Sequence, residues 1–327
     1  MKLATLPNGT KDGALHVVSR DLKMAVRATD IARTLLDALD RWEQVESPLR
    51  ALADKLESGQ APGAVPFNEK DALSPLPRAY AFVDGSAYVN HVELVRKARG
   101  ADLPSSLYTD PLVYQGCSDP FLPPSAPIRH QSEEQGIDFE SEVCVILGEV
   151  PQGTKKENAA RYVRLLCLCN DVTLRNLVPR ELEKGFGFFV SKPPSSLSPV
   201  AVTPDELGES WRDGRVHLPL ITSLNGTKFG DPEAGPEMHF SFHDLIQHVA
   251  QTRPLATGTV LGSGTVSNKD RSRGSSCLAE KRMLEKLDTG EIKTPFLRFG
   301  DRVRIEMLKD GRSIFGAIDQ VVEKLAG

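Results

Sequence analysis

The segment Ile137–Leu147 constrains the fold of this chain most, because it joins an acidic strand start to an apolar interior run. Alternation along a strand would put Asp138, Glu140 and Glu142 on one face. Beyond Glu142 both faces turn apolar, so we expect the strand to enter the interior. Acids in that position repel one another and lose hydration unless a positive charge offsets them. No Lys or Arg lies on this segment, which favours a divalent cation bound by oxygen ligands.

A second strand-like run supports that interpretation over the alternative, a solvated strand face near a sheet edge. Val163–Cys169 is largely apolar, and Asp171 follows at the point where a strand would leave the core. Asp84, which precedes a helical-looking segment, is a further candidate ligand. Together these carboxylates are typical of a site for a hard cation. Without a matching His and Cys cluster, zinc is disfavoured.

Composition argues against several classes of function. The chain of 327 residues has a formal net charge of −4, so it lacks the basic excess of a nucleic-acid binder. The apolar run Val143–Leu147 is far too short to span a bilayer. The five cysteines form no metal-type pairs, and the first residues show no apolar secretory segment. We therefore expect a cytoplasmic protein without a nucleic-acid or membrane partner.

The pattern of turns and apolar residues predicts two domains. Residues 1–21 read as two short strands around an Asn-Gly turn, and the spacing of apolar residues from 28 to 56 is helical. A linker-like stretch at 58–63 follows. We place a small N-terminal domain at 1–72 and the main domain at 73–327.

The main domain interleaves helix and strand irregularly. The sequence predicts helices at 88–98 and 241–251, a helical stretch near 173–184, and strong strands at 138–147 and 162–170. This order does not favour a doubly wound parallel sheet. We expect a β-rich α+β fold.

Three blocks of this chain resemble those of the fumarylacetoacetate hydrolase family. Asp138-Phe139-Glu140-Ser141-Glu142 is similar to the family's D-x-E-x-E block. Asn170-Asp171-Val172-Thr173-Leu174-Arg175 is similar to N-D-x-[ST]-x-R, and Gly262-Ser263-Gly264-Thr265-Val266-Ser267 to G-[ST]-G-T-x-S. They occur in the family's order, over roughly residues 80–325. The resemblance implies a mixed β-sandwich or β-roll catalytic domain with a small α+β N-terminal domain, as in the fumarylacetoacetase-like bacterial branch.

The resemblance also implies the metal and the catalytic residues. The metal would be Mg²⁺ in the first place, with Mn²⁺ or Ca²⁺ as alternatives, and its ligands would be Asp84, Glu140, Glu142 and Asp171. His91 lies seven residues after Asp84, at the spacing of the family's catalytic histidine. Glu280 resembles the glutamate that orients this histidine, and Arg175 and Lys192 match the family's substrate-side and metal-side cations.

Other positions concern the substrate. Tyr114 and Thr265 resemble substrate-contacting residues of the family. Ser86 stands where the fumarylacetoacetase branch often has a substrate-contacting tyrosine, and Val178 stands where it commonly has a glutamine of the oxyanion site. These departures leave the metal ligands intact. They bear on which diketo acid the protein accepts.

The combined expectation is a metal-dependent hydrolase that cleaves a carbon–carbon bond in a β-diketo acid. The substrate would be fumarylacetoacetate, fumarylpyruvate or an acylpyruvate, as in the breakdown of tyrosine and other aromatic compounds. A metal-chelated 1,3-dicarbonyl is polarised for attack, and a histidine held by a carboxylate can deprotonate water. The alternatives are a 2-keto acid decarboxylase, hydratase or isomerase on the same fold, and a non-catalytic metal-binding scaffold. The family resemblance further implies a homodimer.

Overall fold

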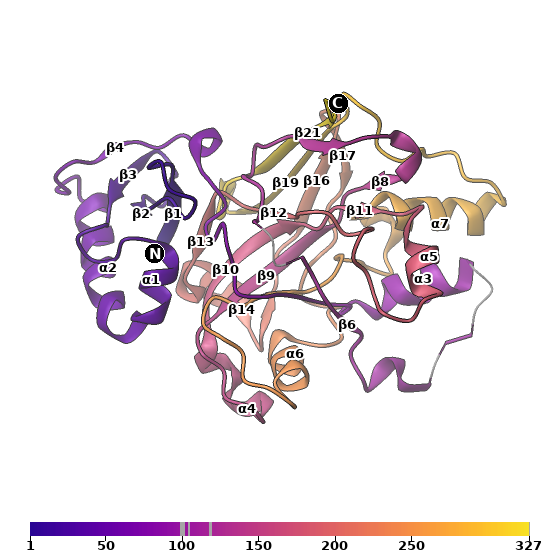
Figure 1. The fold of residues 1–327 in the computed structure, drawn as a ribbon, viewed down its shortest axis with the longest axis horizontal. Coiled ribbons are helices and arrows are strands. Elements are labelled where there is room, and N and C mark those ends of the chain that lie inside the picture. Colours follow the sequence, from indigo (N-terminus) through magenta and orange to yellow (C-terminus); the bar gives the residue numbers. More distant parts are fainter. Residues whose placement is uncertain (99–101, 104, 118–119, 327) are drawn as a thin grey trace.

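A long mixed sheet runs through the molecule from the N-terminal lobe to the far side of the main domain (Figure 1). The computed structural model describes residues 1–98, 102–103, 105–117 and 120–326. The strands of this sheet are, in spatial order, β4 (Val65–Pro66), β3 (Met24–Arg27), β2 (Ala14–Val18), β1 (Lys2–Leu6), β13 (Val200–Val202), β10 (Val163–Asn170), β9 (Ser141–Leu147), β18 (Val260–Gly262), β5 (Phe82–Gly85) and β6 (Val113–Gln115). Strand β12 (Ser196–Leu197) pairs with the end of β10.

A second sheet covers one side of the main domain. Its spatial order is β17 (Thr227–Gly230), β16 (Leu220–Leu224), β19 (Arg302–Lys309), β21 (Ile318–Lys324) and β7 (Ile128–His130), with β20 (Arg312–Ser313) paired to β19. Two small ribbons complete the strands: β8 (Ile137–Asp138) with β11 (Thr173–Leu174), and β14 (Trp211–Arg212) with β15 (Arg215–Val216). The fold is therefore the expected strand-rich mixture of α and β structure.

The helices lie outside the sheets (Figure 1). The α-helices of the described residues are α1 (Leu35–Asp40), α2 (Trp42–Glu57), α3 (Val89–Ala98), α4 (Lys156–Ala159), α5 (Val178–Leu182), α6 (Phe242–Val249) and α7 (Leu278–Thr289). Helices α1 and α2 pack on the N-terminal strands, and α3 packs on α7 at the opposite end of the molecule. Among the described residues, no helix is long and apolar enough to cross a membrane.

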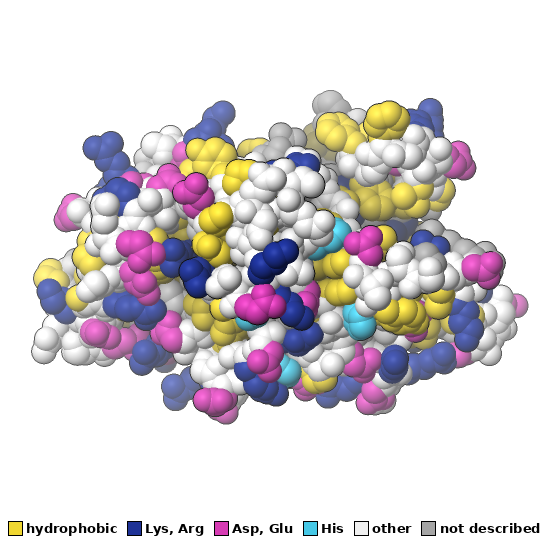
Figure 2. Space-filling model, turned by 90° about the horizontal axis from the view of Figure 1, so that it is seen from below, with side chains coloured by type: hydrophobic (Ala, Val, Ile, Leu, Met, Phe, Trp, Pro, Cys, Tyr) yellow, Lys and Arg dark blue, Asp and Glu magenta, His cyan; other side chains and the backbone are white. Residues whose placement is uncertain are grey.

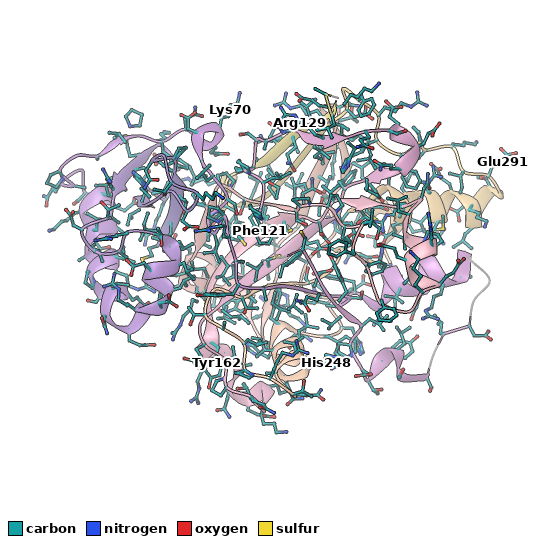
Figure 3. All side chains as sticks on the ribbon, in the orientation of Figure 1. Lys70, Phe121, Arg129, Tyr162, His248 and Glu291 are labelled. Carbon is teal, nitrogen blue, oxygen red and sulfur yellow. The ribbon has the colours of Figure 1, made fainter. Side chains whose placement is uncertain are left out.

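Strand β9 lies between two hydrophobic cores, which explains why all of its residues are buried. Val143, Val145 and Leu147 point into the core shared with the second sheet. Cys144 and Ile146 point into the core shared with the N-terminal lobe. Phe121, labelled near the centre of Figure 3, also belongs to this second core. The strand that carries the acids is thus held by apolar packing on both faces.

Several sequence predictions are confirmed, and others need correction. The hairpin within 1–21 is present as β1 and β2. The helix expected from residue 28 begins only at Leu35, because Thr34 caps α1 by accepting a hydrogen bond from the Asp37 N–H at 3.1 Å. The stretch near 173–184 begins as strand β11 and is helical only in α5. The domain boundary after residue 72 stays a prediction.

The expected strand at 138–147 is interrupted. Residues 137–138 pair with β11, whereas β9 begins only at Ser141. Between them, the Glu140 carbonyl accepts the Asp171 N–H at 3.0 Å. Asp138 therefore does not share a continuous strand face with Glu140 and Glu142.

Candidate metal centre and its pocket

Three buried carboxylates converge from three strands of the long sheet. Asp84 lies on β5, Glu142 on β9, and Asp171 directly follows β10. Their exposed fractions are 6%, 0% and 1%. One oxygen from each lies within 4.8 Å of the other two, which is close enough for a single cation to contact all three.

Gly262 on β18 provides the space between two of these acids. It is paired with Asp84 in parallel register. A Cβ atom at this position would lie 2.3 Å from Asp84 Oδ1 and 3.1 Å from Glu142 Oε2. A side chain at residue 262 would therefore displace the carboxylates.

We expect Gly262→Ala to weaken divalent-metal binding about 10- to 100-fold, a typical effect of disturbing the groups that position metal ligands. Calorimetric titration with Mn²⁺ measures the affinity. The matched control is Gly148→Ala just beyond the other end of β9, where the new Cβ would meet only the Arg164 side chain, at 2.9 Å. Equal Mn²⁺ affinities for the two variants would contradict the role assigned to Gly262.

The electrostatics of the three acids suit a cation. Both Glu142 carboxylate oxygens are buried and have no hydrogen-bond partner among the described residues. Burial, together with the charges of Asp84 and Asp171, raises the pKa of Glu142 well above its usual value. Burial and the Asp171 charge likewise raise the pKa of Asp84 to about 8. Such orphaned oxygens fit a hard divalent ion, which would be bound by Asp84, Glu142 and Asp171.

Two cations lie beside the acids and offset part of their charge. Lys192 Nζ donates to Glu140 Oε2 at 2.6 Å and to Asp171 Oδ2 at 2.5 Å. Arg175 Nη2 donates to Glu140 Oε1 at 2.7 Å. Burial alone would raise the pKa of Glu140, but the charges of Lys192 and Arg175 hold it well below its usual range. Both oxygens of Glu140 are thus engaged by protein groups, and its predicted role as a metal ligand stays a prediction.

Asp138 has a structural task at this site. Its oxygens accept the backbone N–H groups of Leu278 and Ala279, at 2.8 and 2.9 Å, at the start of α7. It also accepts a hydrogen bond from Arg175 Nε at 2.8 Å. A carboxylate at a helix N-terminus is stabilised by the exposed N–H groups there. Asp138 therefore fixes the position of Arg175 relative to α7.

A histidine and a carboxylate from different helices meet at the side of the same pocket. His91 Nδ1 lies 2.8 Å from Glu280 Oε2, with His91 on α3 and Glu280 on α7. The His91 side chain is 17% exposed and the Glu280 side chain 1%. A carboxylate at Nδ1 fixes the ring orientation and leaves Nε2 as the free nitrogen.

A cavity of about 390 Å³ joins these groups. Nine of the predicted site residues line this cavity: Asp84, Ser86, His91, Tyr114, Glu140, Glu142, Arg175, Lys192 and Thr265. The other two, Asp171 and Glu280, do not line it but form hydrogen bonds with residues that do. Tyr114 Oη donates to Asp171 Oδ2 at 2.5 Å, and its ring lies 5.1 Å from Lys192 Nζ. Arg96 on α3 also lines the cavity, whereas Arg99 lies outside the described residues.

Two participants were not predicted from the sequence. Ser195 Oγ donates to Asp171 Oδ1 at 2.6 Å, so it helps to orient that carboxylate. No pattern around Ser195 indicates this contact. Gly262 belongs to the Gly-rich block, but its contribution depends on the pairing of β18 with β5, which the sequence does not reveal.

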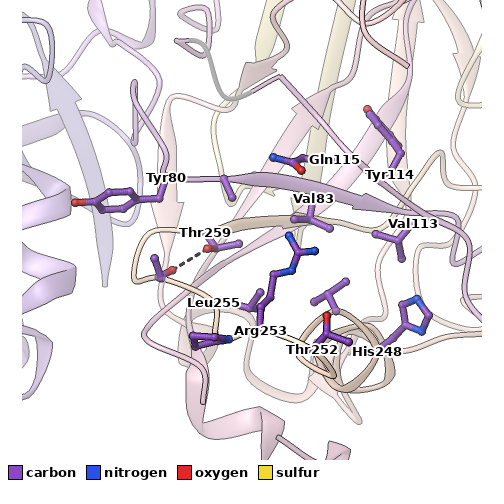
Figure 4. A pocket seen from close by; sticks show the side chains of 14 residues that line it. Tyr80, Val83, Val113, Tyr114, Gln115, His248, Thr252, Arg253, Leu255 and Thr259 are labelled. Atoms are coloured by element: carbon purple, nitrogen blue, oxygen red, sulfur yellow. Dashed lines mark hydrogen bonds between the residues drawn. The ribbon is translucent and has the colours of Figure 1, made fainter. Parts of the chain in front are cut away.

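A larger cavity of about 440 Å³ lies beside β5 and β6 and differs in chemistry (Figure 4). Its described lining residues include Val83, Gln115, His248 and Arg253, and none of those described is an Asp or Glu. Tyr114 borders both cavities. Because this second cavity offers no carboxylate ligands, the candidate site is the smaller one.

Comparison with known proteins agrees with the fold. The family model described as fumarylacetoacetate (FAA) hydrolase C-terminal matches residues 81–323, and that described as fumarylacetoacetase N-terminal domain 2 matches residues 1–78. This chain therefore belongs to the fumarylacetoacetate hydrolase family, which is a family of enzymes.

Individual relatives are distant. Oxaloacetate tautomerase YisK of Bacillus subtilis is 24% identical over 235 residues, covering 71% of this chain and 67% of that protein. The fold is similar to a putative HpcE protein from Mycobacterium smegmatis, with a TM-score of 0.69, 18% identity and full coverage of both chains. It is also similar to maleylpyruvate hydrolase from Sphingobium sp. SYK-6 in complex with manganese(II) and pyruvate, with a TM-score of 0.66, 15% identity and full coverage of both chains.

Proposed function

We propose that this protein is a metal-dependent hydrolase that cleaves a carbon–carbon bond in a β-diketo acid of the fumarylacetoacetate, fumarylpyruvate or acylpyruvate type. The observation that supports this best is the position of the His91–Glu280 pair, at 2.8 Å, beside the cavity that also holds the carboxylates. Hydrolysis needs a base for water next to a group that polarises a carbonyl. The nearness of His91 to the carboxylates supports a site that could meet both requirements.

The carboxylates Asp84, Glu142 and Asp171, with Glu140 as a fourth candidate, would hold Mg²⁺ or Mn²⁺. When bound, the ion supplies Lewis-acid polarisation of the substrate's two carbonyl oxygens. Lys192 adds charge from the protein. Two of its three ammonium donors are engaged by Glu140 and Asp171, so one remains for a substrate oxygen.

The chemical step follows from the histidine pair. Glu280 accepts the His91 Nδ1–H, so Nε2 takes a proton from water. The water oxygen bonds to the acyl carbonyl carbon, and the bond from that carbon to the methylene breaks. The methylene carbon keeps the electron pair as an enolate and receives the proton from the histidinium. The products are a carboxylic acid and a keto acid.

A second candidate is tautomerisation or isomerisation of a 2-keto acid, because the relative from Bacillus subtilis is named an oxaloacetate tautomerase. That reaction also needs a proton carrier beside a polarised carbonyl, but no water attack. The presence of His91 with Glu280 is our reason for placing hydrolysis first. The cytoplasmic location, the homodimer and the place in aromatic catabolism stay predictions.

A spectrophotometric screen tests the proposal. Acylpyruvates, fumarylpyruvate and fumarylacetoacetate are incubated with the protein and Mg²⁺ or Mn²⁺, the loss of enol absorbance is followed, and the acid products are identified by chromatography. Enol oxaloacetate is run in parallel. We expect two acids from at least one diketo acid. Conversion of enol oxaloacetate with no acid product from any diketo acid would favour the tautomerase instead.

A further inference from the structure

The cavity is lined by polar side chains at its buried end, the floor, and includes apolar side chains toward its exposed end, the mouth. The polar residues of the floor are buried, with exposed fractions of 6% for Asp84, 0% for Glu142 and 8% for Lys192. Apolar side chains line another part of the cavity and extend to its exposed end. Val178 is 8% exposed, whereas Leu112 and Leu182 are 45% and 46% exposed. A substrate held at the floor would therefore extend its far end past apolar walls.

These walls come from three separate segments. Val92 lies on α3, Leu112 directly precedes β6, and Val178, Leu182 and Phe188 lie on α5 and the loop after it. The Phe188 ring packs edge-on against Tyr114, with centroids 5.3 Å apart. Hydrophobic side chains also gather on the right-hand half of the face in Figure 2, the half that holds α3 and α5 in Figure 1.

The segment that carries Phe188 is held in place. The Glu181 carboxylate accepts the N–H groups of Phe189, Val190 and Ser191 at 2.7–3.2 Å, and Ser191 Oγ at 2.5 Å. Burial alone would raise the pKa of Glu181, but these hydrogen bonds lower it to about 2. The apolar wall is thus preformed, which reduces the ordering that binding requires.

Charge is scarce among the described residues of this mouth. Of these, Arg96 is the one charged lining residue that belongs to neither the carboxylate cluster with its cations nor the His91 pair. Its Nη1 donates to the Asp102 carbonyl at 3.1 Å in an exposed position. Val178, at the start of α5, lines the same part of the cavity. Its branched side chain cannot donate a hydrogen bond to a polar acyl group.

We propose that the acyl group of the substrate is uncharged and apolar, an alkyl or aryl chain longer than acetyl, and that Val178, Leu182 and Phe188 select it. This inference rests on the proposed hydrolysis of a β-diketo acid and narrows its substrate class to hydrophobic acylpyruvates. Each added methylene that reaches the walls increases kcat/KM about threefold to fourfold, the ratio that corresponds to about 0.8 kcal/mol per buried CH₂.

The test compares acylpyruvates of increasing tail length, from acetyl through butanoyl and hexanoyl to octanoyl, with the complete chain and Mn²⁺. A matched pair isolates the charge: 4-methylpentanoylpyruvate and succinylpyruvate have the same shape, but succinylpyruvate ends in a carboxylate. We expect kcat/KM to rise about tenfold from acetyl to butanoyl and to be at least tenfold higher for the uncharged member of the pair.

Two substitutions of the same kind test whether the apolar lining residues cause the dependence of kcat/KM on tail length. Phe188→Ser removes a lining side chain, whereas Phe186→Ser, two residues earlier, removes a side chain that is 98% exposed and does not line the cavity. We expect Phe188→Ser to reduce the advantage of hexanoyl over acetyl at least threefold and Phe186→Ser to leave it unchanged. A flat dependence on tail length, or a preference for succinylpyruvate that Arg96→Gln abolishes, would overturn the inference while leaving hydrolysis intact.

If the protein does not hydrolyse diketo acids, no member of the series gives an acid product. The same compounds then serve as inert ligands, and their dissociation constants are measured by calorimetry in the presence of Mn²⁺. Tighter binding with longer tails, lost in Phe188→Ser but not in Phe186→Ser, would still support the apolar subsite. Affinities independent of tail length would reject it.

Discussion

We expect His91→Ala to lower kcat for the best diketo acid by a factor of about 10² to 10⁴, the usual contribution of a positioned general base. The substitution removes the nitrogen that would deprotonate water but none of the carboxylates that converge from β5, β9 and β10. Metal affinity and melting temperature should therefore change little. Steady-state kinetics and Mn²⁺ titration of the same preparation measure both quantities.

A second histidine on a helix supplies the control. His248 on α6 lies 3.5 Å from an Asp110 oxygen and lines the other cavity (Figure 4), so His248→Ala removes a similar side chain away from the carboxylates. We expect this variant to keep the parent kcat. If His91→Ala hydrolysed a diketo acid at the rate of the His248→Ala protein, His91 would not be the base. Glu280→Gln should give an intermediate loss, because an amide still contacts the ring but does not stabilise the imidazolium.

The second large effect concerns metal and pH. The folded-state pKa of Asp84 is about 8, above its unfolded value near 4, and that of Glu142 is raised in the same direction. A raised carboxyl pKa means that the fold without metal is most stable when these groups are protonated. It loses that stability as the pH rises from about 4 to about 8. Metal ions need the ionised carboxylates, so metal affinity should rise over the same range.

We therefore expect Mn²⁺ to raise the melting temperature by about 5 °C at pH 8, at a concentration about one hundred times its Kd, and by clearly less near pH 6. Differential scanning calorimetry with and without Mn²⁺ measures the shift. Glu142→Gln should abolish the shift at both pH values, and it should stabilise the metal-free protein at pH 8 because a buried charge is removed. A pH-independent shift, or one retained in Glu142→Gln, would argue against binding at these carboxylates.

The carboxylate cluster could be predicted from the sequence, because acids next to a buried strand are unfavourable unless a positive charge offsets them. Glu142 and Asp171 are recognisable from the apolar runs next to them, and the structure brings both within reach of Asp84. The histidine pair depended on resemblance, because His91 and Glu280 lie 189 positions apart. Spacing within one helix cannot reveal a contact that forms only when α3 packs on α7.

Other features could not be predicted, for physical reasons. The acidic strand was expected to be continuous, because alternation does not show that Asp138 would leave the sheet to cap α7. No residue on the strand offsets its acids, yet Arg175 and Lys192 reach Glu140 from later segments. Long-range ion pairs of this kind depend on tertiary packing. Helix α7 itself was not predicted, although Cys277 at its start accepts the Glu280 N–H through sulfur.

The pairing of β1 with β13 gives the N-terminal lobe a part in the stability of the metal centre. Because β13 pairs in turn with β10, and β10 with β9, the lobe protects what would otherwise be a bare sheet edge two strands from Glu142. Its core also keeps water away from the underside of β9, where Cys144 and Ile146 are buried. The two lobes should therefore unfold together, in one cooperative transition, and a cut between them would leave the catalytic part prone to aggregation.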